Sequence, residues 1–191
     1  MSKLPDLEKY KQKRDFSKTP EPSGEQKIDA EHPLFTIQKH DASNLHYDFR
    51  LEIDGVLASW VIPKGPSTDH SIKRLAIPTE DHPLDYAQFE GVIPEDQYGA
   101  GTVIVWDFGS YENAKDYSMQ QAKEQGKIEV FLKGEKLKGR YALIRTGPKS
   151  ENARWLLIKM KDEYADAGRN PVSTQPESVL SGKTIEEIKS D

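Results

Sequence analysis

Apolar and polar side chains alternate along much of the chain between residues 34 and 160, which is the pattern of half-buried β-strands. The alternation is clearest over residues 46–53. One face of this segment carries Tyr47, Phe49, Leu51 and Ile53, and the other carries His46, Asp48, Arg50 and Glu52. Asp54 and Gly55 follow as a two-residue hairpin signal of type I′. They predict that the chain returns as a second strand over residues 56–62.

Shorter apolar or alternating runs, separated by turn residues, predict the remaining strands. They cover residues 34–40, 74–77, 102–106, 128–132, 140–145 and 155–159. Residues 114–125 are the best helix candidate, and residues 78–94 are expected to form a loop. Many short strands with one clear helix indicate a mainly β fold, either a sandwich or a small barrel.

Two polar segments flank the strand-rich region. Residues 1–33 carry few large apolar side chains, so we expect an N-terminal arm, which is either a solvated tail or a basic arm that reaches a polyanion. Residues 161–191 are again polar and contain prolines, which predicts a C-terminal tail or linker. The expected organisation is therefore an arm at 1–33, a β domain at 34–160 and a tail at 161–191.

Composition narrows the chemistry that the chain can perform. The 191 residues contain no cysteine, which excludes disulfide scaffolds, thiol nucleophiles and iron–sulfur clusters. The 27 basic and 32 acidic residues give a net charge of −5, so nucleic-acid binding would need a local basic patch. No apolar run approaches the ~18 residues of a membrane span, and the first residues lack the hydrophobic stretch of a signal peptide. We therefore expect a soluble cytoplasmic protein without a membrane partner.

The polar face of residues 46–52 carries the most informative chemistry. His46 and Asp48 project to the same side of one strand, with Cβ atoms roughly 7 Å apart. His40, on the preceding strand, can supply a third ligand. Two imidazoles and a carboxylate suit Mn²⁺, Fe²⁺ or Zn²⁺ better than Mg²⁺ or Ca²⁺. The spacing predicts an open metal site at these three residues, and a solvated strand face is the plain alternative.

Three interpretations remain open from the residues alone. Arg50, on the same face, suits a phosphate beside the metal, and His82 could donate a hydrogen bond or proton to a leaving oxygen, which favours a metal-dependent phosphoesterase. A non-haem Fe(II) oxygenase would use His-x-Asp in its facial triad, with His70 or His82 as the distal histidine. A non-catalytic module that binds nucleic-acid ends would use the basic arm. Taken singly, His82 also fits a surface loop residue, and Tyr86 also fits a packing residue.

The metal-site strand belongs to a longer set of motifs. They are RDF at 14–16, TPEPSG at 19–24, FTIQKHDASNLHYDFRLE at 35–52, WVIPKGPS at 60–67, EDHPLDY at 80–86, FEGVIP at 89–94, YGAGTV at 98–103 and WD at 106–107. Together they resemble the phosphoesterase domain of bacterial DNA ligase D, which acts in non-homologous end joining, and its free-standing bacterial and archaeal relatives. The resemblance covers roughly residues 10–160 and reduces the oxygenase to a minor alternative.

The resemblance implies a compact closed or nearly closed β-barrel with few short helices. It implies an Mn²⁺-dependent enzyme, with Co²⁺ or Zn²⁺ as other metals, that trims the 3′ ends of DNA or RNA strands. A phosphodiesterase step removes a 3′-terminal ribonucleoside, and a phosphomonoesterase step then removes the 3′-phosphate to leave a 3′-OH. The implied partners are nucleic-acid 3′ ends, such as a DNA primer–template, and an ATP-dependent DNA ligase, with the domain itself a monomer.

The resemblance also implies roles for individual residues. The metal ligands match His40, His46 and Asp48. The catalytic positions that contact phosphate match Arg50, His82 and Tyr86. Substrate-binding positions match Arg14, Asp15, Gln38, Lys64 and Arg74, with Glu21 as a weaker match. A functional N-terminal arm is therefore favoured over a solvated tail.

Overall fold

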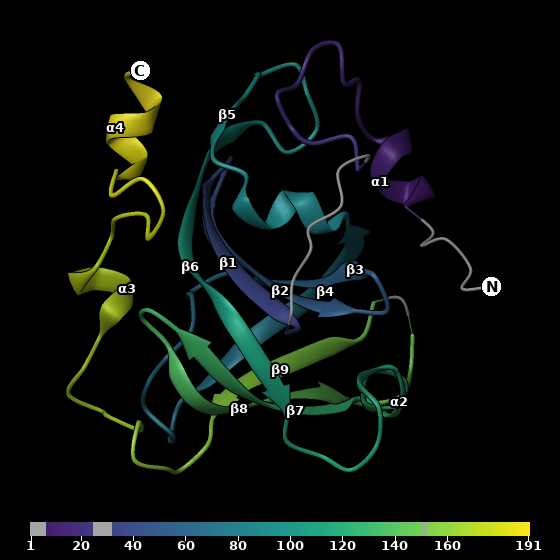
Figure 1. The fold of residues 1–191 in the computed structure, drawn as a ribbon, viewed down its shortest axis with the longest axis vertical. Coiled ribbons are helices and arrows are strands. Elements are labelled where there is room, and N and C mark those ends of the chain that lie inside the picture. Colours follow the sequence, from purple (N-terminus) through teal and green to yellow (C-terminus); the bar gives the residue numbers. More distant parts are fainter. Residues whose placement is uncertain (1–6, 25–31, 151) are drawn as a thin grey trace.

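Strands dominate the computed structural model, which describes residues 7–24, 32–150 and 152–191. In chain order the elements are α1 (Glu8–Gln12), β1 (Leu34–Asp41), β2 (Leu45–Ile53), β3 (Val56–Ile62), β4 (Lys73–His82), η1 (Leu84–Gln88), β5 (Gly91–Ile93), β6 (Gly101–Asn113), α2 (Met119–Gln125), β7 (Lys127–Gly134), β8 (Lys138–Thr146), β9 (Arg154–Lys159), α3 (Pro171–Thr174) and α4 (Ile185–Lys189). Antiparallel pairing runs in the order β1-β2-β3-β4-β9-β8-β7-β6, and β6 also pairs with β1, so the sheet closes into a barrel (Figure 1). β5 adds to the outside of this ring by pairing with β6. The expected mainly β, closed barrel with few short helices is confirmed.

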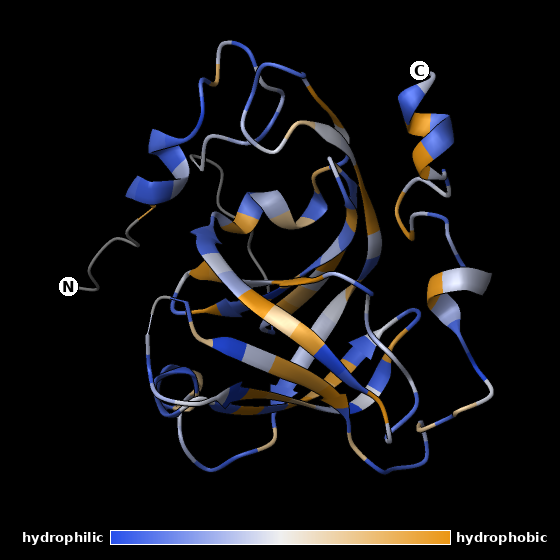
Figure 2. Cartoon of the chain, turned by 180° about the vertical axis from the view of Figure 1, so that it is seen from behind, coloured by the Kyte–Doolittle hydropathy of each residue, from blue (hydrophilic) through white to orange (hydrophobic). Residues whose placement is uncertain are grey.

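The hairpin of β2 and β3 forms as its turn residues predict. Asp54 and Gly55 both have positive φ angles, 52° and 81°, which a type I′ turn requires at its two central residues. The turn sets the register that places Phe49 opposite Trp60. Both side chains point into the barrel, where they are almost completely buried. Figure 2 shows the resulting alternation of hydrophobic and hydrophilic residues along the barrel strands.

Two apolar clusters lie on opposite faces of the β1–β2–β3 sheet. The inner cluster fills the barrel and includes Phe35, Phe49, Trp60, Trp106 and Tyr141. The outer cluster joins these strands to α1 and η1, and it includes Tyr10, Leu57, Tyr86, Phe89 and Val103. The outer face of this sheet is therefore covered by protein, which creates a second sheltered environment outside the barrel.

Several predicted boundaries are wrong, the largest error being that β6 runs from Gly101 to Asn113 where the sequence predicts a strand over residues 102–106. β4 continues through Pro78 to His82 instead of ending at Ile77, because β9 pairs only with the first part of β4 and leaves an edge where a proline is tolerated. α2 begins at Met119 rather than at residue 114, because Ser118 and Gln121 form a capping box that fixes the start.

The C-terminal segment packs along the barrel. Trp106 Nε1 donates to the Gln175 carbonyl at 2.8 Å, and the Val179 amide donates to the Val105 carbonyl at 3.0 Å. α3 and α4 lie beside β6 in Figure 1, and Ile185 of α4 is buried. Of the predicted N-terminal arm, residues 1–6 and 25–31 lie outside the described residues, and the predicted domain limits stay a prediction. Within the described ranges, no helix combines the length and the apolar character that crossing a membrane requires.

Candidate functional site

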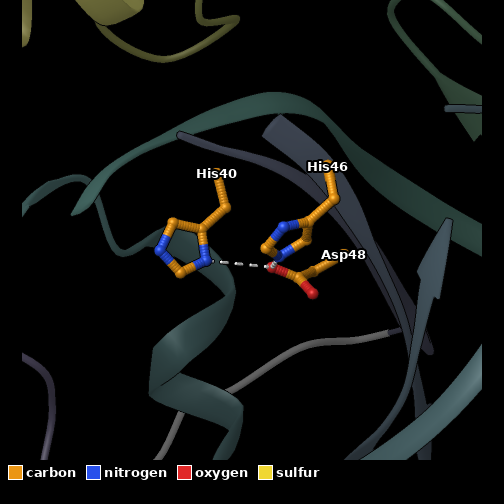
Figure 3. A group of neighbouring side chains, drawn as sticks. All are labelled: His40, His46 and Asp48. Atoms are coloured by element: carbon orange, nitrogen blue, oxygen red, sulfur yellow. Dashed lines mark ion pairs between the residues drawn. The ribbon is translucent and has the colours of Figure 1, made fainter. Parts of the chain in front are cut away.

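The three predicted metal ligands meet on the outer face of the β1–β2 pair (Figure 3). His40 of β1 lies opposite His46 of β2 in the strand register, and Asp48 follows on the same face of β2. His40 Nδ1 is 3.7 Å and His46 Nε2 is 3.4 Å from the same oxygen, Asp48 Oδ2. All three candidate ligand atoms lie within 4.8 Å of one another. One ion placed among these atoms would be within reach of all three side chains.

Backbone carbonyls fix the outward-facing nitrogen of each imidazole. His40 Nε2 lies 2.7 Å from the Gly99 carbonyl oxygen, and His46 Nδ1 lies 3.0 Å from the Asn44 carbonyl oxygen. A ring nitrogen bonded to a carbonyl carries the hydrogen, so the nitrogen that faces Asp48 keeps its lone pair. Metal-binding histidines have this arrangement in proteins. The donor set therefore fits a divalent transition metal in both geometry and tautomer.

Asp48 is buried and ionised. Burial opposes its ionisation, but the Arg50 guanidinium and the two neighbouring imidazoles hold the pKa of this carboxyl well below its usual range. Arg50 Nη2 lies 3.6 Å from Asp48 Oδ2. Burial favours the neutral His46 ring, but the neighbouring Asp48 carboxylate raises the pKa of His46. Asp48 is thus anionic at neutral pH.

Arg50 is held rigidly from two sides. Its Nε donates to Gln38 Oε1 at 2.8 Å, and its Nη1 donates to Ser59 Oγ at 2.9 Å. The Gln38 amide nitrogen in turn donates to the carbonyls of Tyr86 and Phe89, at 2.9 and 3.1 Å. Gln38 is completely buried, so it supports Arg50 from beneath rather than lining the pocket. A guanidinium fixed in this way presents its remaining N–H groups beside Asp48, where an oxyanion can accept them.

His82, at the end of β4, is neutral near pH 7. Burial, assisted by the nearby Arg50 and Arg14 cations, lowers the pKa of His82 well below its ordinary value. His82 Nδ1 lies 2.9 Å from the Glu80 carbonyl oxygen, which places the ring hydrogen on Nδ1. His82 Nε2 is then an acceptor, 3.4 Å from Arg14 Nη2.

Two residues of the N-terminal arm complete the site. Arg14 stacks on the Tyr10 ring, with Cζ 4.0 Å from the ring centroid, and its Nε donates to Glu21 Oε2 at 2.9 Å. Glu21 also accepts a hydrogen bond from the Tyr86 hydroxyl at 2.7 Å. Burial, together with the charge of Glu21, raises the pKa of Tyr86 well above its ordinary value. The buried side chains of Arg14 and Glu21 therefore connect the arm to Tyr86 of η1.

These side chains share one pocket of about 250 Å³. Its predicted functional residues are Arg14, His40, His46, Asp48, Arg50, His82 and Tyr86. The fold thus brings the predicted metal ligands together with the predicted phosphate contacts and with one residue of the arm. Their chemical roles stay predictions.

Three other predicted substrate-binding residues do not line this pocket. Asp15 is exposed and accepts hydrogen bonds from the amide and the hydroxyl of Ser17, at 3.0 and 2.6 Å. Lys64 is exposed in the turn after β3. Arg74 alternates onto the same face of β4 as Ala76, which lies in the inner cluster on the opposite side of the sheet. Their roles in binding substrate also stay predictions.

Sequence reasoning missed Glu80, Tyr98 and Gly99, which line the pocket. Glu80 lies 3.2 Å from Lys13 Nζ and 3.5 Å from Arg14 Nη1. Burial opposes its ionisation, but a hydrogen bond from the Thr79 hydroxyl and the nearby cations lower the pKa of Glu80 to about 2. Glu80 and Tyr98 each lie in one of the quoted motifs, and this was the only sequence feature that linked them to the site.

Comparisons with known proteins agree with this site. A family model described as the DNA ligase D 3′-phosphoesterase domain matches residues 38–145, a range that contains the three predicted metal ligands, Arg50, His82 and Tyr86. The chain is 51% identical over 183 residues to the multifunctional non-homologous end joining protein LigD of Pseudomonas aeruginosa, across 94% of this chain and 22% of that protein.

Two further relatives show similar identity. The chain is 48% identical over 158 residues to the multifunctional non-homologous end joining DNA repair protein LigD of Mycobacterium tuberculosis, across 82% of this chain and 20% of that protein. It is 45% identical over 162 residues to the LigD protein of Mycolicibacterium smegmatis, across 82% of this chain and 21% of that protein. The chain therefore spans about a fifth of the length of these relatives.

Proposed function

The chain belongs to the DNA ligase D 3′-phosphoesterase domain family, and from this premise we propose that it is a metal-dependent hydrolase that heals the 3′ ends of nucleic-acid strands. In the first step, water adds to the phosphorus, the P–O5′ bond breaks, and a 3′-terminal ribonucleoside leaves behind a 3′-phosphate. In the second step, water releases that phosphate and leaves a 3′-OH. The observation that carries the proposal is the convergence of two imidazoles, a carboxylate and a fixed guanidinium in one pocket.

His40, His46 and Asp48 would hold the metal, for which we propose Mn²⁺, with Co²⁺ or Zn²⁺ as alternatives. When bound, the ion would supply Lewis-acid stabilisation of charge on a phosphate oxygen. Arg50 would bind a second phosphate oxygen through the N–H groups that Gln38 and Ser59 leave unused. Because these contacts hold the guanidinium in place before substrate arrives, little reorganisation opposes its stabilisation of developing charge.

His82 and Tyr86 would act at the far wall of the pocket. The lowered pKa of His82 and the bond from its Nδ1 to the Glu80 carbonyl support an accepting role for Nε2 near pH 7, rather than the donating role expected from the sequence. Nε2 can take the proton of an attacking water. The Tyr86 hydroxyl, whose one hydrogen goes to Glu21, would position the arm beside the phosphate; it would have to release Glu21 to donate to a phosphate oxygen. Arg14 would add positive charge on the same side.

The names of the relatives suggest the setting of the reaction. We propose that the substrates are DNA 3′ ends, on a primer–template or with an RNA terminus, and that an ATP-dependent DNA ligase uses the 3′-OH that results. We also propose that the chain acts as a cytoplasmic monomer. The acidic net charge of −5 means that strand affinity would depend on the local cations Lys13, Arg14 and Arg50, and would fall as salt rises.

A labelled primer–template with one 3′-terminal ribonucleotide, incubated with Mn²⁺, tests this function. We expect conversion first to a 3′-phosphate strand and then to a 3′-OH strand. Asp48→Asn, which removes the carboxylate charge at nearly constant size, should abolish both conversions. Asp116→Asn, at an exposed aspartate before α2, is the matched control and should behave as wild type. A folded wild-type protein that converts no strand with Mn²⁺, Co²⁺ or Zn²⁺ would contradict the proposal.

A further inference from the structure

The pocket at the predicted metal ligands is small and open to solvent on one side. Its volume of about 250 Å³ lies below the roughly 300–1,000 Å³ that is usual for small-molecule sites. A strand end can therefore place its phosphate beside Asp48 and Arg50, while the base attached to the same nucleotide remains at the mouth. What that base contacts decides how the phosphate is aligned.

Tyr98 offers an aromatic surface at this mouth. Its side chain lines the pocket and is 48% exposed, whereas the other tyrosine of the lining, Tyr86, is only 3% exposed. Tyr98 directly precedes Gly99, whose carbonyl oxygen lies 2.7 Å from His40 Nε2. The backbone that carries the ring is thus tied to a metal ligand, which fixes the spacing between the ring and the reacting phosphate.

Cations of the N-terminal arm hold the ring in place. Lys13 Nζ lies 4.7 Å from the centroid of the Tyr98 ring and 3.4 Å from its hydroxyl, and Arg14 Cζ lies 5.5 Å from the centroid. Lys13 is in turn paired with Glu80 at 3.2 Å. An aromatic ring that is already oriented loses little conformational entropy when a base stacks on it. The same cations would attract the phosphates of an approaching strand.

We propose that Tyr98 stacks on the base of the nucleotide whose 3′ oxygen carries the reacting phosphate, an inference that rests on the proposed function. Every base has an aromatic face, so such stacking tolerates any sequence and suits a substrate that is defined by its end. Tyr98 is a positioning residue in this account. Its loss should raise KM roughly 10- to 100-fold, as expected from the contribution of one base–aromatic stack.

A comparison of protein and substrate variants tests the stacking. Two labelled strands carry the same 3′-terminal ribonucleoside, and in one of them the preceding nucleotide, which bears the scissile phosphate, is an abasic tetrahydrofuran residue. The proteins are wild type, Tyr98→Phe, Tyr98→Ala and Tyr164→Ala. Tyr164 is the matched control because it is 47% exposed and lines a different groove. KM and kcat are measured for each pair, and Mn²⁺ affinity is measured for each protein.

If Tyr98 stacks on the base, the loss caused by removing the Tyr98 ring and the loss caused by removing the base should not add. Tyr98→Ala should raise KM on the normal strand with kcat nearly unchanged, the abasic strand should raise the KM of wild type similarly, and the two together should cost little more than one. Tyr98→Phe and Tyr164→Ala should match wild type, and Mn²⁺ affinity should be the same in all. A wild-type KM for Tyr98→Ala on the normal strand would overturn the inference. So would equal losses on both strands or weakened Mn²⁺ binding, because these indicate a structural role through Gly99.

Failure of the proposed function has a different signature. In that case wild type cleaves neither strand. The same comparison is then made by fluorescence anisotropy of strand binding, with the same four proteins and two strands. Binding losses from Tyr98→Ala and from the abasic residue that remain non-additive would support the stacking, and binding unaffected by Tyr98→Ala would overturn it.

Discussion

Both faces of strand β2 are buried. Apolar side chains surround the inner face, whereas polar and charged side chains surround the outer face. On the inner face, Phe49 and Leu51 are completely buried among other apolar side chains of the barrel. On the outer face, Asp48 and Arg50 are only 5% and 3% exposed, yet they lie among imidazoles, amides and hydroxyls. Nearly equal burial therefore has different consequences on the two sides of one strand.

The apolar side chains of the inner face stabilise the fold, whereas the charged side chains of the outer face contribute little net stability. Fully burying a large apolar side chain contributes about 1.5–3 kcal/mol. A buried ion pair gives little net stability, because desolvating both charges offsets their attraction. The metal and phosphate chemistry proposed above would explain why the outer face holds these charges together. Changes on the outer face should remove activity, and changes on the inner face should remove stability.

The largest expected effect is on the outer face, at His46. His46→Gln removes one predicted metal ligand, and because a bound metal contributes several kcal/mol to the transition state, kcat/KM should fall roughly 1,000-fold. The melting temperature should change little, since the His46 side chain is not part of either apolar cluster. Steady-state cleavage of the ribonucleotide-ended strand, combined with thermal melting, measures both effects. His70→Gln, at an exposed histidine, is the control, and a similar loss there would contradict the assignment.

The inner face should give the reverse result. Phe49→Ala leaves a cavity in the barrel and should lower the free energy of unfolding by about 3–5 kcal/mol. The folded fraction should keep its kcat/KM at low temperature, because the Phe49 side chain lies in the inner cluster, on the opposite face of β2 from Asp48 and Arg50. Urea unfolding at equilibrium measures the loss, with Phe131→Ala as the control at a ring that is 38% exposed. Wild-type stability together with lost activity would break the comparison between the two faces.

Arg50→Lys sharpens the comparison by keeping the charge and removing the geometry. A lysine cannot reproduce the bonds that Arg50 makes to Gln38 and Ser59, so we expect kcat/KM to fall about 10- to 100-fold. Mn²⁺ affinity should stay within a few-fold of wild type, because the positive charge beside Asp48 remains. Kinetics and Mn²⁺ titration test this together. Arg154→Lys, at an exposed arginine, should leave both unchanged, and an unaltered kcat/KM in Arg50→Lys would contradict the phosphate-binding role.

The smallest effect concerns Glu80, which fastens the arm over the outer face. Its folded pKa of about 2 lies below the ordinary 4.5, so Glu80 stabilises the fold above pH 4.5, and this contribution is lost as the pH falls toward 2. Between pH 6 and pH 3 we expect wild type to lose about 1–2 kcal/mol more than Glu80→Gln, after allowance for solvent screening. Urea unfolding at both pH values measures the difference. Glu124→Gln, in an exposed ion pair, should lose as much as wild type, and an equal loss in Glu80→Gln would exclude this role.

The barrel and the meeting of His40, His46 and Asp48 could be predicted because their signals are local. Alternation and the Asp54–Gly55 turn specify the β2–β3 hairpin, and the five residues between His40 and His46 suit a short connection that sets the two histidines opposite each other. The alternation of β4 also places Arg74 on the face of Ala76, a signal that could have separated Arg74 from the site.

The packing of the N-terminal arm and η1 over the outer face of β2 could not be predicted in the same way. The bond between Glu21 and Tyr86 joins residues that are 65 positions apart, and the contact between Arg14 and His82 spans 68 positions. No periodicity encodes such contacts, because they depend on how α1 and η1 pack on the finished barrel. The family resemblance supplied these residues where spacing could not. It supplied neither the support that Gln38 gives to Arg50 nor the exposure of Tyr98 at the pocket mouth.

The central claim is that the outer face of β2 holds one divalent metal through His40, His46 and Asp48. The most direct measurement is a titration of the metal-free protein with Mn²⁺, followed by the electron paramagnetic resonance signal of free Mn²⁺. We expect one bound ion per chain in wild type and in Asp116→Asn, and none over the same concentration range in Asp48→Asn. An active wild type that binds no Mn²⁺, or an Asp48→Asn variant that binds it as tightly as wild type, would contradict the account.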